Sequence, residues 1–222
     1  INALWKNKIS VLVGDFLLSR GLLLAVEKNE FSLLRIMSKA VKDMSEGELM
    51  QIEKTRRLNI TEDEYFEIIK KKTAALISAC CESGASSSKT SDENIKTMRN
   101  FGEKVGIAFQ IKDDLFDYTQ STLIGKPTGL DIREKKMTLP LIYTLNNVSK
   151  NDKKFIINTI KNDSKNPKKV EQIIMLVKKN KGLEFAESKM NHYFNQSINL
   201  LGNFKNNEAK QSLTQLVEYV IK

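Results

Sequence analysis

The sequence predicts an all-α protein, a single domain over residues 1–222, from three observations. Only three prolines and ten glycines interrupt the chain, so long helices are expected. Apolar residues recur at three- and four-residue spacing, the period of amphipathic helices. No stretch alternates convincingly with period two, so we predict no sheet. A chain of this length can bury a substantial core in one domain, and it shows no repeats and no linker.

Three helices are expected before residue 83. The first runs to a break at residues 29–30, and the second covers residues 31–56, where Gly47 indicates close helix packing rather than an end, with a kink as the alternative. The third begins at a capping box in which Thr61 caps the helix and Glu64 reaches back to it. We expect it to end near residue 82.

The second half of the chain continues the helical pattern. A Gly/Ser-rich loop at residues 83–91 is expected to lead into a long helix that is capped by Ser91 or Asp92 and ends near Gln120. Residues 123–137 are expected to form an ordered loop. Further helices are expected at 138–146, 152–161, 167–182, 183–201 and 207–221.

The chemically distinctive part of the chain is the stretch from Phe101 to Asp131. Asp113, Asp114 and Asp117 stand at i, i+1 and i+4, which places three carboxylates on one sector of a helix. A divalent cation that shares its oxygen ligands with substrate phosphates would justify this crowding of like charge. The alternative is a solvated helix face or an N-cap run. The stripe continues backwards at four-residue spacing through Gly102, Gly106 and Gln110.

Cations follow the acids in the Gly- and Pro-punctuated segment GKPTGLDIREKKMTLP. Carboxylates for a metal beside cations for an anion form the pairing that a magnesium-diphosphate substrate requires. The cations are Lys126, Arg133, Lys135 and Lys136.

The segments AFQIKDDLFD and GKPTGLDIREKKMTLPLIY resemble the second aspartate-rich motif and the following loop of the trans-isoprenyl diphosphate (polyprenyl) synthases. WKNKISVLVGDFLLSR and KKKTAALISACCESGA agree with the same family in order and spacing. The resemblance extends to the last helix and corresponds to about the C-terminal two-thirds of a synthase. The family's first aspartate-rich motif is expected just upstream of Trp5 and is absent from this sequence. We therefore expect the functional protein to carry that motif in additional N-terminal helices.

The resemblance implies an isoprenoid synthase-like bundle around a deep central cavity that holds the prenyl chain. It implies that Asp113 and Asp114 bind Mg²⁺ and that Asp117 contributes directly or through water. It also implies that Asp131 orients Lys126 or Lys136, with a water-mediated metal contact as a further role. The implied diphosphate contacts are Lys72, Thr73, Gln110, Lys126 and Lys136, of which Lys72 and Lys126 join Asp113 and Asp114 as the catalytic residues. The implied cavity-lining residues include Leu12, Phe16, Leu76 and Phe109.

Two features of this sequence bear on the roles that the resemblance implies for Lys72 and Lys136. Lys72 is one of three consecutive lysines, and without the family it would be read as a surface residue. The usual family pattern has a glycine before the second lysine of the loop, where this chain has Lys135. That replacement adds charge and stiffens the loop before Lys136.

The implied activity is a prenyltransferase that condenses isopentenyl diphosphate with an allylic diphosphate to make a longer polyprenyl diphosphate. Two alternatives stay open: a catalytically silent subunit of a heteromeric prenyl synthase, supported by the missing first motif, and a class I terpene cyclase. The Gly-Lys-Pro and Lys-Lys-Met-Thr-Leu-Pro segments favour the synthase.

Composition limits the partners and the location. The net charge of +9 suits nucleic acid, an anionic membrane or a phosphorylated substrate, but dispersed lysines with few interleaved aromatics argue against nucleic acid. We expect a homodimer with transient membrane contact for product release. The adjacent Cys80 and Cys81 are expected to be reduced, packed thiols in a cytoplasmic protein. Asp15 and Arg20 interrupt the longest apolar run, so no membrane span is expected.

Overall fold

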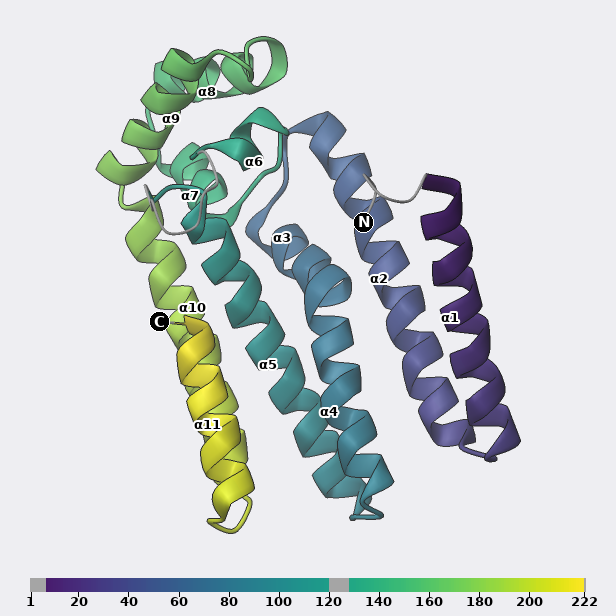
Figure 1. The fold of residues 1–222 in the computed structure, drawn as a ribbon. Helices are drawn as coiled ribbons and strands as arrows, with labels where there is room; N and C mark the ends of the chain where they lie inside the picture. Colours follow the sequence, from purple (N-terminus) through teal and green to yellow (C-terminus); the bar gives the residue numbers. More distant parts are fainter. Residues whose placement is uncertain (1–6, 120–127, 222) are drawn as a thin grey trace.

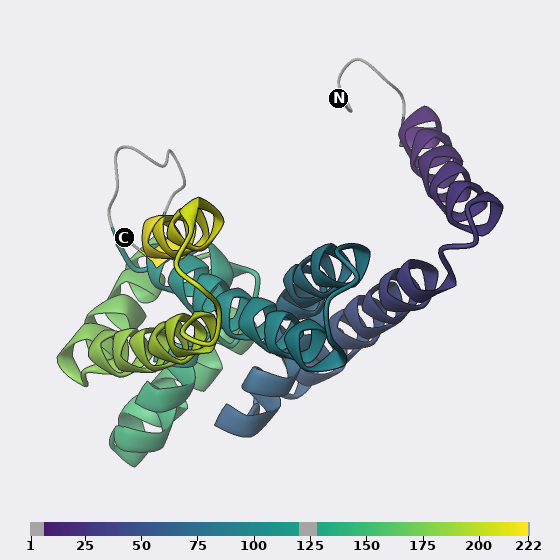
Figure 2. The same cartoon turned by 90° about the horizontal axis from the view of Figure 1, so that it is seen from below.

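The computed structural model describes residues 7–119 and 128–221, and in these ranges every regular element is a helix, which confirms the all-α prediction. Helices α2, α4, α5, α10 and α11 run side by side, α1 lies at the edge of the array beside α2, and α8 and α9 lie at one end (Figures 1 and 2). The elements are α1 (Asn7–Glu27), α2 (Phe31–Arg57), α3 (Glu62–Ile69), the π-helical turn η1 (Lys70–Ala74), α4 (Ala75–Ser87), α5 (Asp92–Phe116), α6 (Leu130–Arg133), α7 (Leu139–Asn147), α8 (Lys150–Asn162), α9 (Pro167–Lys179), α10 (Gly182–Leu201) and α11 (Glu208–Ile221).

The predicted helix starts are present in atomic detail. The Thr61 hydroxyl accepts the backbone N–H of Glu64, and the Glu64 carboxylate accepts the backbone N–H of Thr61 at 2.9 Å, which completes the capping box of α3. The Ser91 hydroxyl accepts the N–H of Asn94 and caps α5. At the first break Asn29 is left-handed, with φ 56°. Local capping chemistry therefore sets where α3 and α5 begin.

Small residues bring three elements together around η1. A Cβ atom on Gly106 of α5 would lie 2.5 Å from Ala74 Cα, and one on Gly102 would lie 2.7 Å from the Ile77 carbonyl oxygen. From the other side, a Cβ atom on Gly47 of α2 would lie 2.6 Å from the Lys72 backbone nitrogen. The π-turn thus packs between α2 and α5, and the helix backbones approach it so closely at Gly47 and Gly106 that only glycine fits there.

The structure corrects some element boundaries. Residues 83–87, expected as part of a loop, continue α4 to Ser87, whose hydroxyl donates to the Ser83 carbonyl one turn earlier and so tolerates the helix. Helix α5 ends at Phe116, before the expected Gln120. The expected ordered loop contains the short helix α6, which begins after Gly129 with φ 75°.

Lys135 has φ 62° in the left-handed region. Left-handed backbone favours glycine, which explains physically why the family pattern has glycine at this position.

The edge of the array near α1 is apolar and open. Phe16, expected to line the cavity, is 61% exposed, and Leu12, Leu76 and Phe109 are exposed as well. By length and composition residues 8–27 could cross a membrane, with a mean hydropathy of 1.9 and no burial, which corrects the expectation that Asp15 and Arg20 exclude such a segment.

Both cysteines are free. Cys80 is exposed rather than packed, because it lies on the opposite side of α4 from the buried Ser78 and Ala79. Cys81 is partly buried, and this burial raises its pKa to about 11.

Candidate functional site

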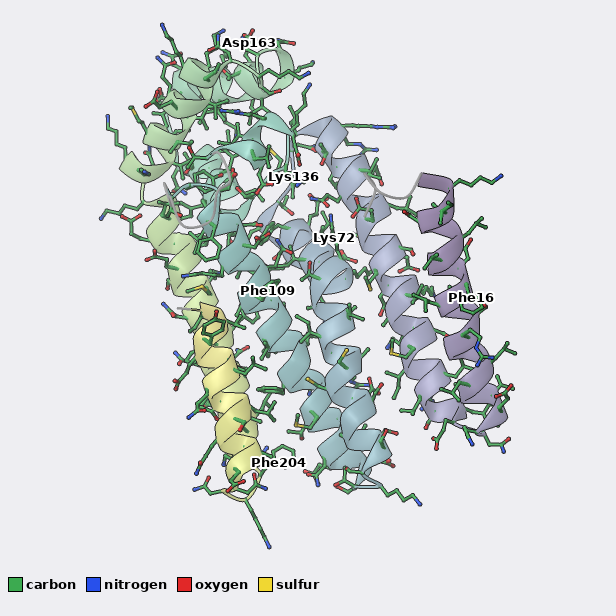
Figure 3. All side chains as sticks on the ribbon, viewed as in Figure 1. Phe16, Lys72, Phe109, Lys136, Asp163 and Phe204 are labelled. Atoms are coloured by element: carbon green, nitrogen blue, oxygen red, sulfur yellow. The ribbon has the colours of Figure 1, made fainter. Side chains whose placement is uncertain are left out.

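A pocket of about 170 Å³ opens between α2, α3, η1, α5 and the segment that follows α6. It brings together all of the predicted site residues except Asp117 and Lys126, and Lys126 lies outside the described residues. Lys72 and Lys136 approach it from different elements at the same end of the bundle (Figure 3). The lining residues are Gln51, Ile60, Tyr65, Ile68, Ile69, Lys72, Thr73, Gln110, Asp113, Asp114, Asp131, Lys136, Met137 and Thr138.

The π-turn η1 divides the three consecutive lysines between two sides of the helix. Lys70 pairs with Glu103 at 3.0 Å and Lys71 pairs with Glu46 at 3.4 Å, away from this pocket. Lys72 alone of the three lines the pocket, where its ammonium contacts Glu48 at 2.7 Å and donates to Gln51. Single π-turns inside helices are frequent at functional sites. This geometry separates Lys72 from the surface lysines beside it.

Asp114 is the buried acid of the cluster, with a side chain only 6% exposed. Its Oδ2 accepts the Tyr65 phenol at 2.7 Å, and its Oδ1 accepts the Gln110 amide at 3.0 Å. The Gln110 oxygen in turn accepts the Thr73 hydroxyl at 2.6 Å. Burial raises the pKa of Asp114 to about 7 although these hydrogen bonds oppose the shift.

Asp113 and Asp117 take different positions. Asp113 is exposed and lines the pocket beside Asp114. Asp117 does not line it; its two oxygens accept the backbone N–H groups of Leu130 at 2.8 Å and Asp131 at 3.1 Å. Burial and the nearby Asp131 raise the pKa of Asp117 to about 6. The described contacts make Asp117 the anchor of α6, and its metal contact stays a prediction.

Asp131 and Lys136 form the cation side of the pocket. The Lys136 ammonium contacts Asp131 at 3.1 Å, the pairing expected from the sequence, and Glu134 at 2.8 Å. Burial lowers the pKa of Lys136, but the hydrogen bonds to Glu134 and Asp131 outweigh burial and hold the pKa above its usual value. Lys136 therefore stays charged at neutral pH.

The donor chemistry of the pocket fits Mg²⁺. Asp113, Asp114 and Asp131 offer only oxygen ligands, the preference of a hard cation. Within residues 7–119 and 128–221, no group of three or more ligating side chains is close enough to hold a metal by itself. Mg²⁺ commonly takes one or two carboxylates and completes its coordination with substrate phosphates and water. The residues present match that mode of binding.

Sequence reasoning missed three polar members of the pocket, Tyr65, Gln51 and Thr138. Tyr65 precedes Lys72 by seven residues, a spacing that would place both on one face of a regular α-helix and was the only signal in the sequence, but the π-turn η1 begins between them. Gln51 belongs to the body of α2, and the packing of α2 on η1, which includes the close approach at Gly47, brings it to Lys72.

A family model described as polyprenyl synthetase matches residues 1–177. The chain belongs to this family. The chain is 31% identical to heptaprenyl diphosphate synthase component 2 of Bacillus subtilis. The match covers 99% of this chain and 62% of that relative. The chain is also 31% identical to the all-trans-nonaprenyl-diphosphate synthase (geranyl-diphosphate specific) of Rhodobacter capsulatus, and that match covers 99% of this chain and 67% of the relative.

Solved structures of polyprenyl synthetase relatives share the fold. A decaprenyl diphosphate synthase from Rhodobacter capsulatus superposes with a TM-score of 0.91 at 33% identity, over 99% of this chain and 68% of its own. A polyprenyl synthase from Caulobacter crescentus, solved with calcium and isoprenyl diphosphate, superposes with a TM-score of 0.90 at 31% identity. This match covers 99% of this chain and 67% of the Caulobacter chain. The chain thus spans about two-thirds of the length of these relatives.

Proposed function

We propose that the protein is a Mg²⁺-dependent trans-prenyltransferase that condenses isopentenyl diphosphate with an allylic diphosphate to give a longer polyprenyl diphosphate. The observation that carries the proposal is the pocket in which Asp113 and Asp114 face Lys72 and Lys136. Carboxylates and ammonium groups within one pocket suit a metal-bound diphosphate, and neither set alone would. The names of the relatives support the same activity.

Each described residue has a part in this proposal. Asp113 and Asp114, as the second aspartate-rich motif of the family, would hold Mg²⁺, which when bound stabilises the negative charge of a departing diphosphate. Lys72 and Lys136 bind diphosphate oxygens as point charges. Lys72 exchanges its contact with Glu48 for the substrate, and Lys126 remains a predicted diphosphate contact in the segment outside the described residues.

Neither alternative gains support from the site. A silent subunit has no need for a buried, hydrogen-bonded Asp114 beside two cations. The relatives compared above are named as synthases rather than as cyclases. We therefore favour the active synthase.

The test is a product assay with radiolabelled isopentenyl diphosphate and a set of allylic diphosphates of increasing length. We expect Mg²⁺-dependent elongation, and we expect Asp113→Asn to lower turnover by several orders of magnitude with unchanged helical circular dichroism. Asp92→Asn makes the same change in the exposed first turn of the same helix and serves as the matched control. Elongation by Asp113→Asn at the wild-type rate would contradict the assignment.

We also propose that two copies associate through the exposed apolar residues of α1 and α2. The two helices expose many large apolar side chains, and contiguous exposed apolar surface marks interaction sites. Light scattering should give twice the chain mass, and Phe16→Glu should give the monomer mass; a wild-type monomer would overturn this proposal. The exposed apolar residues include Leu12, Phe16, Leu17, Leu23, Met37, Val41 and Ile52.

A cytoplasmic location is proposed as well, supported by the two free cysteines. Recovery of the protein in the membrane fraction after a carbonate wash would instead assign α1 to a bilayer.

A further inference from the structure

We propose that Tyr65 is a positioning residue for the metal site, and that its phenol holds the Asp114 carboxylate in the orientation that binds the cation. This inference rests on the proposed function, because it assigns a role within the same pocket. It concerns a residue on α3, outside the aspartate-rich motif and outside the loop that carries the cations.

The contact between Tyr65 and Asp114 is buried and long-range in sequence. The phenol oxygen lies 2.7 Å from Asp114 Oδ2, and the Tyr65 side chain is 4% exposed. The phenol O–H donates this hydrogen bond, and the carboxylate oxygen accepts it. Forty-nine residues separate the two side chains, so helix packing, rather than local geometry, places them together.

Two successive hydrogen bonds, from Thr73 to Gln110 and from Gln110 to Asp114, hold the second oxygen of Asp114, and the donor in each can be assigned. As a metal ligand Asp114 must be ionised, and an ionised carboxylate accepts hydrogen bonds but donates none, so Gln110 presents its NH₂ group to Oδ1 and its carbonyl oxygen to Thr73. Thr73 has a single hydroxyl proton, which is therefore donated to Gln110. Tyr65 on α3 and Gln110 on α5 thus hold Asp114 directly, and Thr73 on η1 holds Gln110 in place.

These hydrogen bonds leave free lone pairs on the Asp114 carboxylate that can coordinate a cation. A carboxylate has about four lone-pair sites, and the two hydrogen bonds occupy one site on each oxygen. Donors that orient a metal ligand without touching the metal typically contribute 10–100-fold in metal affinity. Of the two donors, Tyr65 is the rigid one, because its ring is buried and packs edge-on against Phe66 at 5.4 Å between ring centroids.

The competing explanation is that Tyr65 only stabilises the core through a buried hydrogen bond. The chain offers a matched control for that role in Tyr118. Its side chain is 1% exposed, and its hydroxyl lies 2.6 Å from Thr138, which also lines the pocket, so Tyr118→Phe removes an equally buried phenol hydrogen bond at the same pocket without removing one from Asp114.

The experiment compares Tyr65→Phe and Tyr118→Phe in the purified protein. Mn²⁺ affinity is measured by electron paramagnetic resonance titration in the presence of inorganic diphosphate, together with the melting temperature and the Mg²⁺ dependence of turnover. We expect Tyr65→Phe to weaken Mn²⁺ binding by about 10–100-fold. Its turnover should return to within a few-fold of wild type at saturating Mg²⁺. Tyr118→Phe should lose similar thermal stability and keep Mn²⁺ affinity within about twofold.

Wild-type Mn²⁺ affinity in Tyr65→Phe, or equal weakening in both variants, overturns the proposal. If Tyr65→Phe does not fold, the titration is repeated in the Gly84→Ala background, where a methyl group in open space adds helix propensity. If the wild-type protein makes no prenyl product but Tyr65→Phe still loses Mn²⁺ affinity selectively, the proposed function fails and the positioning role stands.

Discussion

Two identical substitutions, Gly106→Ala and Gly84→Ala, should change stability in opposite directions. Both glycines lie within helices, so both gain about 1 kcal/mol of helix propensity on substitution. At Gly84 no atom outside the adjoining backbone of the same helix lies within 4 Å of the new Cβ position. At Gly106 the new Cβ would lie 2.5 Å from Ala74 Cα and 2.7 Å from Ala74 Cβ, and Ala74 is fully buried.

The net effect follows from these contacts. Overpacking a core costs about 1–3 kcal/mol, and the upper end applies because η1 must shift as backbone. Gly106→Ala should therefore lose about 2 kcal/mol, which corresponds to a fall in melting temperature of roughly 4–8 °C for a chain of this size. Gly84→Ala should gain about 1 kcal/mol and raise the melting temperature by roughly 2–4 °C.

Scanning calorimetry and urea denaturation measure both values, and Mn²⁺–diphosphate titration measures the site. Because η1 carries Lys72 and Thr73, Gly106→Ala should also weaken diphosphate binding, whereas Gly84→Ala should leave it unchanged. Equal stabilisation by the two substitutions would refute the close packing of α5 on η1.

Two further predictions concern the acid site and the cap of α3. Because burial raises the pKa of Asp114 to about 7, its contribution to stability is present at low pH and is lost as the pH rises from about 4 towards 7. The metal-free protein should therefore lose a few kcal/mol relative to Asp114→Asn between pH 5 and 8; parallel stability profiles by calorimetry would contradict this sign. Thr61→Ala removes the cap of α3 and should cost about 1 kcal/mol in urea denaturation, whereas a change below about 0.3 kcal/mol would show that tertiary packing alone holds α3.

The sequence was sufficient where local chemistry decides the structure. The capping box at Thr61, the cap at Ser91 and the break at Asn29 are local signals, and the structure confirms all three. Gly47 correctly indicated close helix packing, because a Cβ atom there would lie 2.6 Å from the Lys72 backbone nitrogen.

Other features depend on contacts between distant segments. The pairing of Tyr65 with Asp114 needs α3 packed on α5, and the placement of Lys72 needs a π-turn whose formation is not visible in the pattern of apolar residues. Asp117 shares the spacing of the other acids, but its hydrogen bonds to α6 give it a different part in the site. Spacing predicts which side chains share a helix face, and it does not predict what that face will meet.

The most direct measurement of the central claim is the position of bound Mn²⁺ and inorganic diphosphate, determined by anomalous diffraction. We expect an anomalous peak coordinated by Asp113 and Asp114, with the diphosphate contacting Lys72 and Lys136. Asp113→Asn should lose that peak and retain the fold. A metal bound elsewhere, or a diphosphate that avoids both lysines, would contradict the account of this pocket as the catalytic centre of a prenyltransferase.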